Sequence, residues 1–474
     1  MSGVLNQLWT IARHSIVQAI RMRLVAVLVV FLLVLIPALP FLLQGDKTHA
    51  GQLRLVLTYT IYLISFILSV LTLFLSAITL NTEIRNQHIF LLDPKPVSRG
   101  ILLLGKWVGV MLIIIVLLVA MLAMTYGIVQ YLGRQMPWES AQEYKAFRAE
   151  VMSARRVAVP PLPDLREWVK QEARFARENN LAPADWSDAW LEMKIHQRLQ
   201  KAAWRVAPGE TVKWEIKLDK TLPPSEVILI RFRHHGDKGA YDHILKGQFV
   251  INESAQPVVN YPDPLRRIGP PGFQVGVPNS FMVSARVLKP DGALELRYTN
   301  TDPDGVGALF PFEDGVQILY PSHGIGMNFL MIGGLMFSKL TLIAIVGIFA
   351  STFMSFPVAV FFSLVVFVVG HLASFIFTDL LKDLYLFGTS MVPPWMPLRA
   401  GDEILRNLIA GFFSVFPNFA QYDLVPVMTD GILISYHPVL NCFVSFVVIR
   451  GGVLAVLAWY IYRRRELAAL TPTT

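Results

Sequence analysis

Gly100 and the pair Gly105-Lys106 have the spacing at which glycines and a lysine surround the phosphates of a nucleotide. The residue after the lysine in such a loop is Ser or Thr, whose hydroxyl holds Mg²⁺. Here that residue is Trp107, and residues 101–104 are aliphatic. Because four aliphatic residues that continue into an apolar stretch cannot form a tight polar loop, we exclude a phosphate-binding loop. The segment instead indicates the start of a membrane helix.

Residues 302–313 have part of the spacing of a calcium-binding loop. The residues at its first, third, sixth and twelfth positions are Asp302, Asp304, Gly307 and Glu313. Val306 stands at the fifth position, which needs an oxygen ligand, and no helices are expected on either side. We therefore predict an acidic turn.

A second group with metal-binding side chains is His234, His235 and His243, with Asp237 and Asp242 nearby. It lies in a predicted strand and turn. It includes no cysteine and lacks the helical spacing of paired zinc-binding histidines. We predict a solvated turn here, and no metal bound by this chain.

Lys339 and Arg450 interrupt apolar stretches of the chain. A charge inside a bilayer is costly and by default marks a functional position, such as a partner for a substrate headgroup. The alternative is that each side chain reaches the membrane surface or pairs with a helix end. His371 is interpreted as a hydrogen-bonded core histidine, and Cys442, the single cysteine, as a small core or lipid-facing residue.

The whole chain has the composition of an integral membrane protein. Of its 474 residues, 54% are hydrophobic and 16% are charged, and the mean hydropathy is +0.49. The net charge is +8, but residues 134–320 hold 25 Lys and Arg against 24 Asp and Glu. The excess therefore belongs to membrane flanks, which excludes nucleic acid as a partner.

Uncharged stretches long enough to cross a bilayer, which needs about 20 residues, predict six spans. They are 24–43, 55–82, 107–133, two within 324–378, and 436–462. The two middle spans are separated by a turn at 351–357. The first span has no signal-peptidase site, so we interpret it as an uncleaved anchor.

Basic residues gather before the first span, in the loop 83–106 and after the last span. Lys and Arg favour the cytoplasmic side, and six spans place these three regions together. We therefore expect a bacterial inner-membrane protein with both termini in the cytoplasm. Residues 4–23 resemble an amphipathic helix on the inner leaflet, and 401–416 an interfacial or re-entrant helix on the outer side.

Residues 134–323 form the predicted extracytoplasmic domain. Apolar residues near helical spacing predict a helical part at 138–206, and alternating apolar and polar residues predict a small β-sandwich at 210–320. The domains are thus 1–133, 134–323 and 324–474. The predicted fold class is a polytopic α-helical membrane protein with about six spans and an α+β insertion.

The loop 83–106 combines a short amphipathic segment, a bend at Pro94 and Pro96, and a basic turn before the third span. Such an element could lie parallel to the membrane and present a rigid surface beneath it. On charge alone, an ordinary cytoplasmic loop explains it as well.

This loop resembles a segment of ABC-2 type transporter permeases. The matching residues are Glu83, then Lys95-Pro96-Val97-Ser98-Arg99, then Leu103-Leu104-Gly105-Lys106. Residues 351–360 are similar to the second cytoplasmic turn of that family, 416–424 to the segment before its last span, and 462–467 to its tail. The resemblance covers roughly 1–133 and 324–474, and it does not extend to the insertion.

The resemblance implies a permease subunit of an ABC-2 type exporter, which is not an enzyme and binds no cofactor itself. It implies that a separate ABC ATPase subunit holds ATP and Mg, and that two copies of this chain form a homodimer in the lipid bilayer. The residues it assigns to coupling with the ATPase are Glu83, Arg85, Asp93, Lys95, Pro96, Val97, Ser98, Arg99 and Lys106. Those of the second cytoplasmic turn are Ser351, Ser355 and Pro357. Gly105 is expected to pack closely and Lys106 to extend towards the membrane surface.

Two other classes of function remain open. One is a membrane-anchored binding protein whose spans only hold residues 134–323 against an outer partner, without an ATPase. The other is a membrane enzyme acting on lipid or glycan. Its candidate carboxylates are Asp379, Asp383, Asp402 and Glu403, which acidic outer loops also explain.

Overall fold

The computed structural model describes residues 2–43, 49–85, 98–135, 148, 151–161, 165–179, 188, 191–192, 195, 203–224, 226–237, 244–252, 272–276, 278–312, 314–375 and 397–464. The chain forms two compact units. The first, here called the membrane unit, is Met1–Pro137, Ile325–Asp430 and Ile434–Thr474. The second, the β unit, is Trp138–Gly324 with Gly431–Leu433.

Among the described residues, six helical segments are long and apolar enough to cross a bilayer, which confirms the predicted fold class. Five of them lie in α2 (Arg23–Leu42), α3 (His49–Arg85), α5 (Arg99–Gln135), α9 (Gly326–Ser351) and α10 (Phe356–Phe375). The sixth, Tyr436–Arg464, consists of α14 (Tyr436–Phe443), a π-helical segment (Val444–Gly451) and α15 (Gly452–Arg464). The third span begins at Arg99 rather than at residue 107, because Lys106 is buried inside the bundle.

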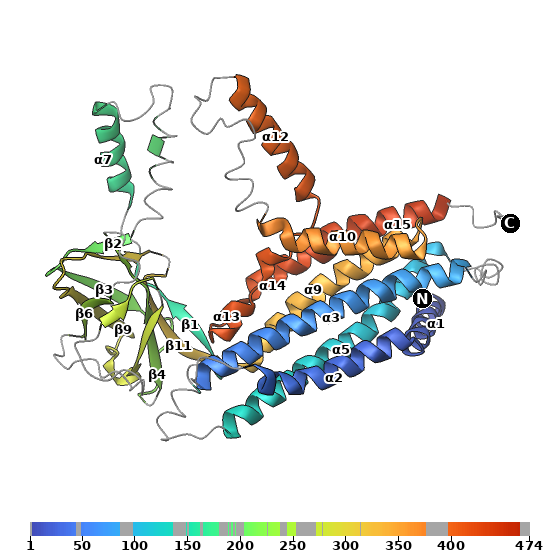
Figure 1. Cartoon of the computed structure of the whole chain (residues 1–474), viewed down its shortest axis with the longest axis horizontal. Coiled ribbons are helices and arrows are strands. Elements are labelled where there is room, and N and C mark those ends of the chain that lie inside the picture. Colours follow the sequence, from blue (N-terminus) through green and yellow to red (C-terminus); the bar gives the residue numbers. More distant parts are fainter. Residues whose placement is uncertain are drawn as a thin grey trace. The chain divides into compact units, whose positions relative to one another are not determined.

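The centre of the membrane unit is formed by α3, α5 and α9, which contact one another (Figure 1). A Cβ atom placed on Gly347 of α9 would lie 2.8 Å from Cβ of Ser76 on α3. Helix α1 (Ser2–Ile20) packs along α5, where a Cβ on Gly109 would lie 2.7 Å from the carbonyl oxygen of Ala12. Small residues at such contacts let membrane helices approach closely, so these positions set the distances between the helices.

The chain turns between α9 and α10 at residues 352–355, as predicted. Helix α12 (Pro397–Ser414) covers most of the predicted interfacial helix, and Ile404, Leu408 and Phe412 are exposed on it. After α12, a short 3₁₀ turn (Ala420–Tyr422) and α13 (Val425–Thr429) lead to the last span. These two short elements shape one wall of the cavity described below.

The described part of the β unit forms three antiparallel sheets (Figure 1). The strands, in chain order, are β1 (Ser153–Ala158), β2 (Ala203–Val206), β3 (Thr211–Lys217), β4 (Val227–Phe232), β5 (His235–Gly236), β6 (Ile244–Ile251), β7 (Gly272–Gln274), β8 (Asn279–Ser284), β9 (Ala293–Asn300), β10 (Ala308–Pro311) and β11 (Val316–Gly324). The sheet orders are β1-β11-β4-β8, β3-β9-β6-β7 and β2-β10-β5. The segment Gly431–Leu433 joins this unit because Arg155 N donates to Gly431 O and Leu433 N donates to Arg155 O.

One hydrophobic core joins the sheets of the β unit. Side chains alternate along β3 and β6 between buried and more exposed, as expected for strands with one face inside. In register, Trp214 lies opposite Leu296, and Ile230 lies opposite both Phe281 and Ile318; all five belong to this core. The alternation that predicted strands within 210–320 is thus present in β3 and β6.

The prediction of a helical part at 138–206 is wrong for β1 and β2. Helix α7 (Leu165–Glu178) does form there, and its Val169 and Ala173 pack against Leu191 and Ile195. Strand β1 pairs along β11, however, and β2 pairs along β10. Pairing with strands more than 90 residues away decides these segments, and local spacing cannot reveal it.

Candidate functional site

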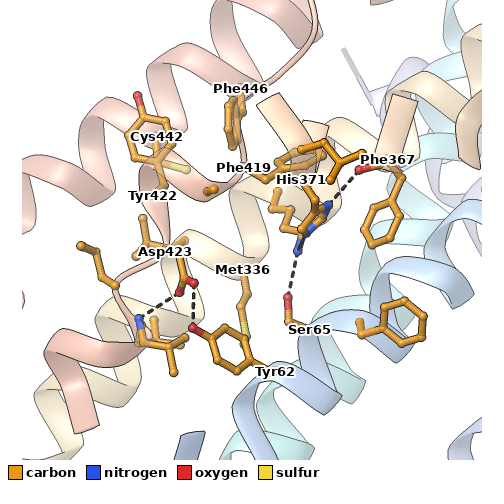
Figure 2. A pocket seen from close by; sticks show the side chains of 18 of the residues that line it. Tyr62, Ser65, Met336, Phe367, His371, Phe419, Tyr422, Asp423, Cys442 and Phe446 are labelled. Carbon is orange, nitrogen blue, oxygen red and sulfur yellow. Dashed lines mark hydrogen bonds between the residues drawn. The ribbon is translucent and has the colours of Figure 1, made fainter. Parts of the chain in front are cut away.

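A cavity of about 480 Å³ lies within the membrane unit (Figure 2). Its walls are parts of α3, α9, α10, the segment 419–425 and the last span. The polar side chains that line it are Tyr62, Ser65, Lys339, His371, Tyr422, Asp423 and Cys442. Most of the other lining residues are aliphatic or aromatic. Small-molecule sites have such volumes, about 300–1,000 Å³, and similar linings with a few polar groups.

The ammonium group of Lys339, on α9, contacts side chains from three other parts of the membrane unit. Nζ donates a hydrogen bond to Ser65 Oγ at 3.0 Å and lies 3.0 Å from His371 Nε2. The same nitrogen is 5.5 Å from the ring centroids of both Phe367 and Phe419. A cation at that distance is attracted by the negative face of an aromatic ring. Lys339, which was noted in the sequence for its charge, is thus in contact with groups from α3, α10 and the segment before α13.

His371 orients its ring between the backbone and Lys339. Nδ1 lies 2.8 Å from the carbonyl oxygen of Phe367, so Nδ1 carries the proton and donates it. Nε2 is then free to accept from the Lys339 ammonium. The prediction of a core histidine is wrong, because the ring lines the cavity, although its two nitrogens do have partners. The geometry fits a neutral imidazole beside a charged lysine.

Asp423 provides the carboxylate of the cavity. Oδ2 accepts a hydrogen bond of 2.7 Å from the Tyr62 hydroxyl, and Oδ1 accepts one of 3.2 Å from the backbone N–H of Val425. Val425 is the first residue of α13, whose N-terminal N–H groups have no partner within the helix. The carboxylate is therefore fixed in direction by one helix start and one side chain of α3.

Gly370 explains why an aromatic ring stands beside His371. A Cβ atom on Gly370 would lie 2.6 Å from Cε2 of Phe419, so any larger residue would displace that ring. Phe419 N also donates to Gly370 O at 2.9 Å. The ring centroids of Phe419 and His371 are consequently 5.0 Å apart. One glycine on α10 thus brings the segment before α13 against the cavity.

Arg99 lies at the start of α5 and binds the end of the last span. Nη1 donates to the carbonyl oxygens of Tyr462 at 2.8 Å and Arg463 at 3.1 Å. These carbonyls belong to the last turn of α15, where a cation compensates the negative end of the helix dipole. Arg99 therefore joins the start of α5 to the end of α15.

Residues 9–147 match a family model described as ABC-2 family transporter protein. The match covers most of α1, all of α2, α3 and α5, and the loop between α3 and α5. No curated protein matches the chain.

Residues 9–147 of this chain are thus similar to ABC-2 family transporter proteins. The finding confirms the resemblance to ABC-2 type permeases, and together with the six candidate spans among the described residues it supports a multi-pass ABC transporter permease in general. Such a permease is a membrane component of transport. The part that the family model does not cover includes α9, α10 and the last span, which supply three walls of the cavity.

The predicted coupling loop is described only at its ends. Glu83 and Arg85 lie in the last turn of α3, and Asp93, Lys95, Pro96 and Val97 fall outside the described residues. Ser98 precedes α5, and its Oγ accepts from the N–H of Ile101, as a helix N-cap does. The assignment of these residues to an ATPase contact stays a prediction.

Gly105 and Lys106 lie where α1 packs on α5. A Cβ atom on Gly105 would be 2.7 Å from Cγ2 of Ile11, so the expected close packing is present. Lys106 differs from expectation, because its side chain is 0% exposed and does not extend along the helix surface. Its burial removes the free surface that the prediction assumed.

The predicted second cytoplasmic turn lies between α9 and α10. Its Ser351 is buried, and the Ser351 hydroxyl lies 3.0 Å from Ala77 O on α3 and 2.8 Å from Gly347 O on α9. Ser355 and Pro357 are exposed at the start of α10. Ser351 thus joins two helices of the permease, whereas the other two are accessible to a partner.

Arg450 lies in the π-helical segment and does not line the cavity. Its Nη1 donates to Ser445 Oγ within the same segment. In a π-helix the backbone hydrogen bonds join residues five apart, so side chains at this spacing are neighbours. Arg450 thus contacts a neighbour in its own segment, and its role as a functional charge stays a prediction.

In the β unit, His234 is 1% exposed and lies among the rings of Phe232, Phe273 and Phe310. The prediction of a solvated turn is wrong at this position. Burial lowers the pKa of His234 to about 4, against a smaller opposing effect of the Phe273 backbone. His243 and Asp242 lie outside the described part of the chain.

The calcium-like segment folds as a turn held by Asp302. Its carboxylate oxygens accept from the N–H groups of Lys246 and Val306, and its own N–H donates to Asn300 Oδ1. Gly305 has a positive φ of 69°, which the turn requires. Among the described residues, no three His, Cys, Asp or Glu side chains are grouped as a metal site; Glu313 is not among them.

Sequence reasoning did not find Tyr62, Ser65 or Asp423. Asp423 carried a usable signal, because it is an acid in the otherwise largely apolar segment just before the last span. Tyr62 and Ser65 carried none, since polar residues of this size are common in membrane helices. Their partners are 361 and 274 residues away in the chain.

Proposed function

We propose that this permease is the membrane subunit of an ABC-2 type exporter in a bacterial cytoplasmic membrane. A separate ATPase subunit binds ATP and Mg²⁺ and docks against the loop 83–106. Two copies of the chain form the transport unit, both termini are cytoplasmic, and the β unit lies on the outer side, where it meets the substrate or a protein partner. The match to the family over α1 to α5, including that loop, is the observation that carries the proposal.

The contact of Arg99 supports a mechanical coupling. A push on the loop would move the start of α5, and through the Arg99 hydrogen bonds it would also move the end of α15. The last span continues from α15 through the π segment to Phe446 and Cys442, which line the cavity. Movement at the cytoplasmic end can thereby reach the cavity through one continuous helix. Nucleotide-driven closure of the ATPase would switch the spans between two arrangements.

The test is co-purification of the ATPase with the tagged permease, co-expressed with its genomic neighbours, followed by measurement of ATP turnover. We expect Lys95→Glu to weaken the association or the permease-stimulated turnover at least about tenfold, because it reverses a charge at the proposed contact. The matched control is Lys220→Glu, an exposed lysine of the β unit, which should leave both unchanged.

A co-purifying ATPase that responds to Lys95→Glu and not to Lys220→Glu supports the proposal. Absence of any nucleotide-binding partner from native membranes would contradict it and favour a membrane-anchored binding protein. Equal effects of the two substitutions would reject the loop as the docking site.

The Arg99→Glu substitution alone cannot show whether Arg99 contacts the ATPase directly, because it also removes the hydrogen bonds to the carbonyl oxygens of Tyr462 and Arg463. Arg99→Lys keeps the charge but loses the planar guanidinium that reaches both carbonyls. If Arg99 acts through α15, Arg99→Lys should leave ATPase binding intact and reduce the stimulation of turnover. Loss of binding in Arg99→Lys would instead indicate a direct contact with the ATPase.

A further inference from the structure

The cavity holds two opposite charges in an otherwise apolar lining. Lys339 supplies the cation and Asp423 the carboxylate, and neither forms an ion pair with the other among the described residues. Burying charges is costly unless partners compensate them. Each charge has neutral partners that hold it in place and leave it able to bind a further group of opposite charge.

Each charge retains capacity for a ligand. The Lys339 ammonium has three protons, and Ser65 and His371 occupy two. The Asp423 carboxylate has about four acceptor positions, and Tyr62 and Val425 occupy two. A ligand with one anionic and one cationic group could therefore bind both residues without displacing any protein contact.

Aromatic rings surround both binding positions. Phe367 and Phe419 face Lys339, and Tyr62 and Tyr422 line the cavity with Asp423. A ring face attracts an alkylammonium group, and a ring also packs against apolar parts of a ligand. A purely anionic ligand would meet repulsion from Asp423, and a purely cationic one repulsion from Lys339. A zwitterion is the charge type that both residues favour.

The mouth of the cavity is apolar and exposed. Phe66 on α3 is 56% exposed, and Val368 and Leu372 on α10 are 45% and 50% exposed, and all three line the cavity. In apolar spans, exposed aliphatic and aromatic side chains face the hydrocarbon of the bilayer. A ligand can therefore enter from the membrane with its polar end in the cavity and its apolar part among lipid chains.

We propose that the Lys339–Asp423 cavity binds a membrane-dissolved amphiphile with a zwitterionic headgroup, an anionic phosphate or carboxylate close to an ammonium group. The anion contacts Lys339 and the ammonium contacts Asp423. That this ligand is the transported cargo rests on the function proposed above, whereas its binding does not require the ATPase or ATP.

Binding is measured on the purified full-length chain in detergent by native mass spectrometry, with three lipids of identical acyl chains. Phosphatidylethanolamine carries both charges, phosphatidic acid only the anion, and a trimethylammonium lipid only the cation. We expect phosphatidylethanolamine to bind at least about tenfold more tightly than either of the others, because hydrogen bonds to charged groups contribute that much. Soluble phosphoethanolamine is a fourth probe, and binding weaker than that of the lipid by at least the same factor is expected if the bilayer supplies the ligand.

Two variants separate the charges. Lys339→Met should weaken phosphatidylethanolamine binding about tenfold and leave the cationic lipid unaffected or better bound. Asp423→Asn should weaken it to a similar extent and favour phosphatidic acid. Arg450→Met and Asp430→Asn make the same changes outside the cavity and should stay within about twofold of the unsubstituted chain, with the same elution profile in detergent.

Equal affinity for the three lipids, or headgroup preferences that do not change in Lys339→Met and Asp423→Asn, would overturn the proposal. So would tighter binding of soluble phosphoethanolamine than of the lipid, because the ligand would then come from water. A variant that elutes as aggregate is replaced by Lys339→Gln or Asp423→Ser. If the chain binds phosphatidylethanolamine selectively but has no ATPase partner, the binding site stands and the exporter function is rejected. If an ATPase partner is found but the lipid is not bound selectively, the exporter function stands and this ligand is rejected.

Discussion

The membrane unit and the β unit each place a histidine among phenylalanine rings, with opposite results. In the β unit, His234 is 1% exposed inside a closed core. In the membrane unit, His371 lies with its ring centroid 4.4 Å from that of Phe367, yet it lines an open cavity and contacts Lys339. Aromatic neighbours alone therefore do not determine what a histidine does.

The difference lies in what the rings enclose. Around His234, rings from β4, β7 and β10 bury the imidazole, and this burial lowers its pKa and favours the neutral form. Around His371, the helices diverge, and polar groups from separate helices meet across the space between them. A polar residue that bridges elements across a cavity is available for recognition, whereas one enclosed by a single core contributes to stability.

The largest effect is expected from acid on the β unit. The pKa of His234 is lowered to about 4 in the folded state, compared with about 6.5 when unfolded. Between these values the unfolded state binds more protons, so stability falls as pH falls from 6.5 to 4, by up to about 3 kcal/mol. Hydrogen exchange of β4 and β10 amides in the full-length protein, corrected for intrinsic rates, measures this loss.

His234→Phe should remove this pH dependence of the stability of the β unit, while the phenyl ring still fills the core. Glu295 is the comparison within the same unit. Its pKa is lowered to about 2 by hydrogen bonds from Lys213 and Arg297, so its contribution is lost only below about pH 4.5. A slope between pH 6.5 and 4.5 that survives in His234→Phe would show that another group is responsible.

A smaller effect is expected at His371. His371→Leu leaves the Lys339 ammonium with Ser65 as its remaining side-chain acceptor. In a double-mutant cycle with Lys339→Met, followed by unfolding in a denaturing detergent, we expect a coupling free energy of about 1 kcal/mol, typical of hydrogen bonds between membrane helices. A coupling of zero would mean that the two side chains do not interact, and the comparison with His234 would fail.

The smallest effect is expected at Ser65. Ser65→Ala removes the acceptor on α3 and should cost about 0.5 kcal/mol in the same assay. Ser69, one turn further along α3, donates only to Ser65 O of its own helix among the bonds described. Ser69→Ala should therefore cost less than Ser65→Ala, and the opposite order would argue against a bond between α3 and α9.

The spans and the presence of strands within 210–320 were predictable because each depends on a local pattern. An apolar stretch of about 20 residues leaves few alternatives to a membrane helix, and alternating apolar and polar residues indicate strands with one buried face, as in β3 and β6. Strands β1 and β2 were missed because distant pairing decides them. The extended start of the third span depended on the burial of Lys106 by packing that the sequence does not display.

Of the cavity's charged pair, Lys339 was predicted, because a lone cation in an apolar span is conspicuous, whereas the signal of Asp423 was not used. Its partners Ser65 and His371 are ordinary residues for their helices, and their roles arise from how α3, α9 and α10 pack. Arg450 had the same signal in the sequence and forms a local contact instead. Charge within a span therefore marks a candidate, and the surrounding helices decide between the two outcomes.

The central claim is that the permease meets what it moves at the Lys339 cavity. Its most direct test is lipid-stimulated ATP hydrolysis by the permease with its ATPase in liposomes, with and without phosphatidylethanolamine, for the unsubstituted chain, Lys339→Met and Arg450→Met. The account predicts that Lys339→Met lowers the stimulation about tenfold and that Arg450→Met changes it less than about twofold. Equal stimulation in the two variants would contradict it.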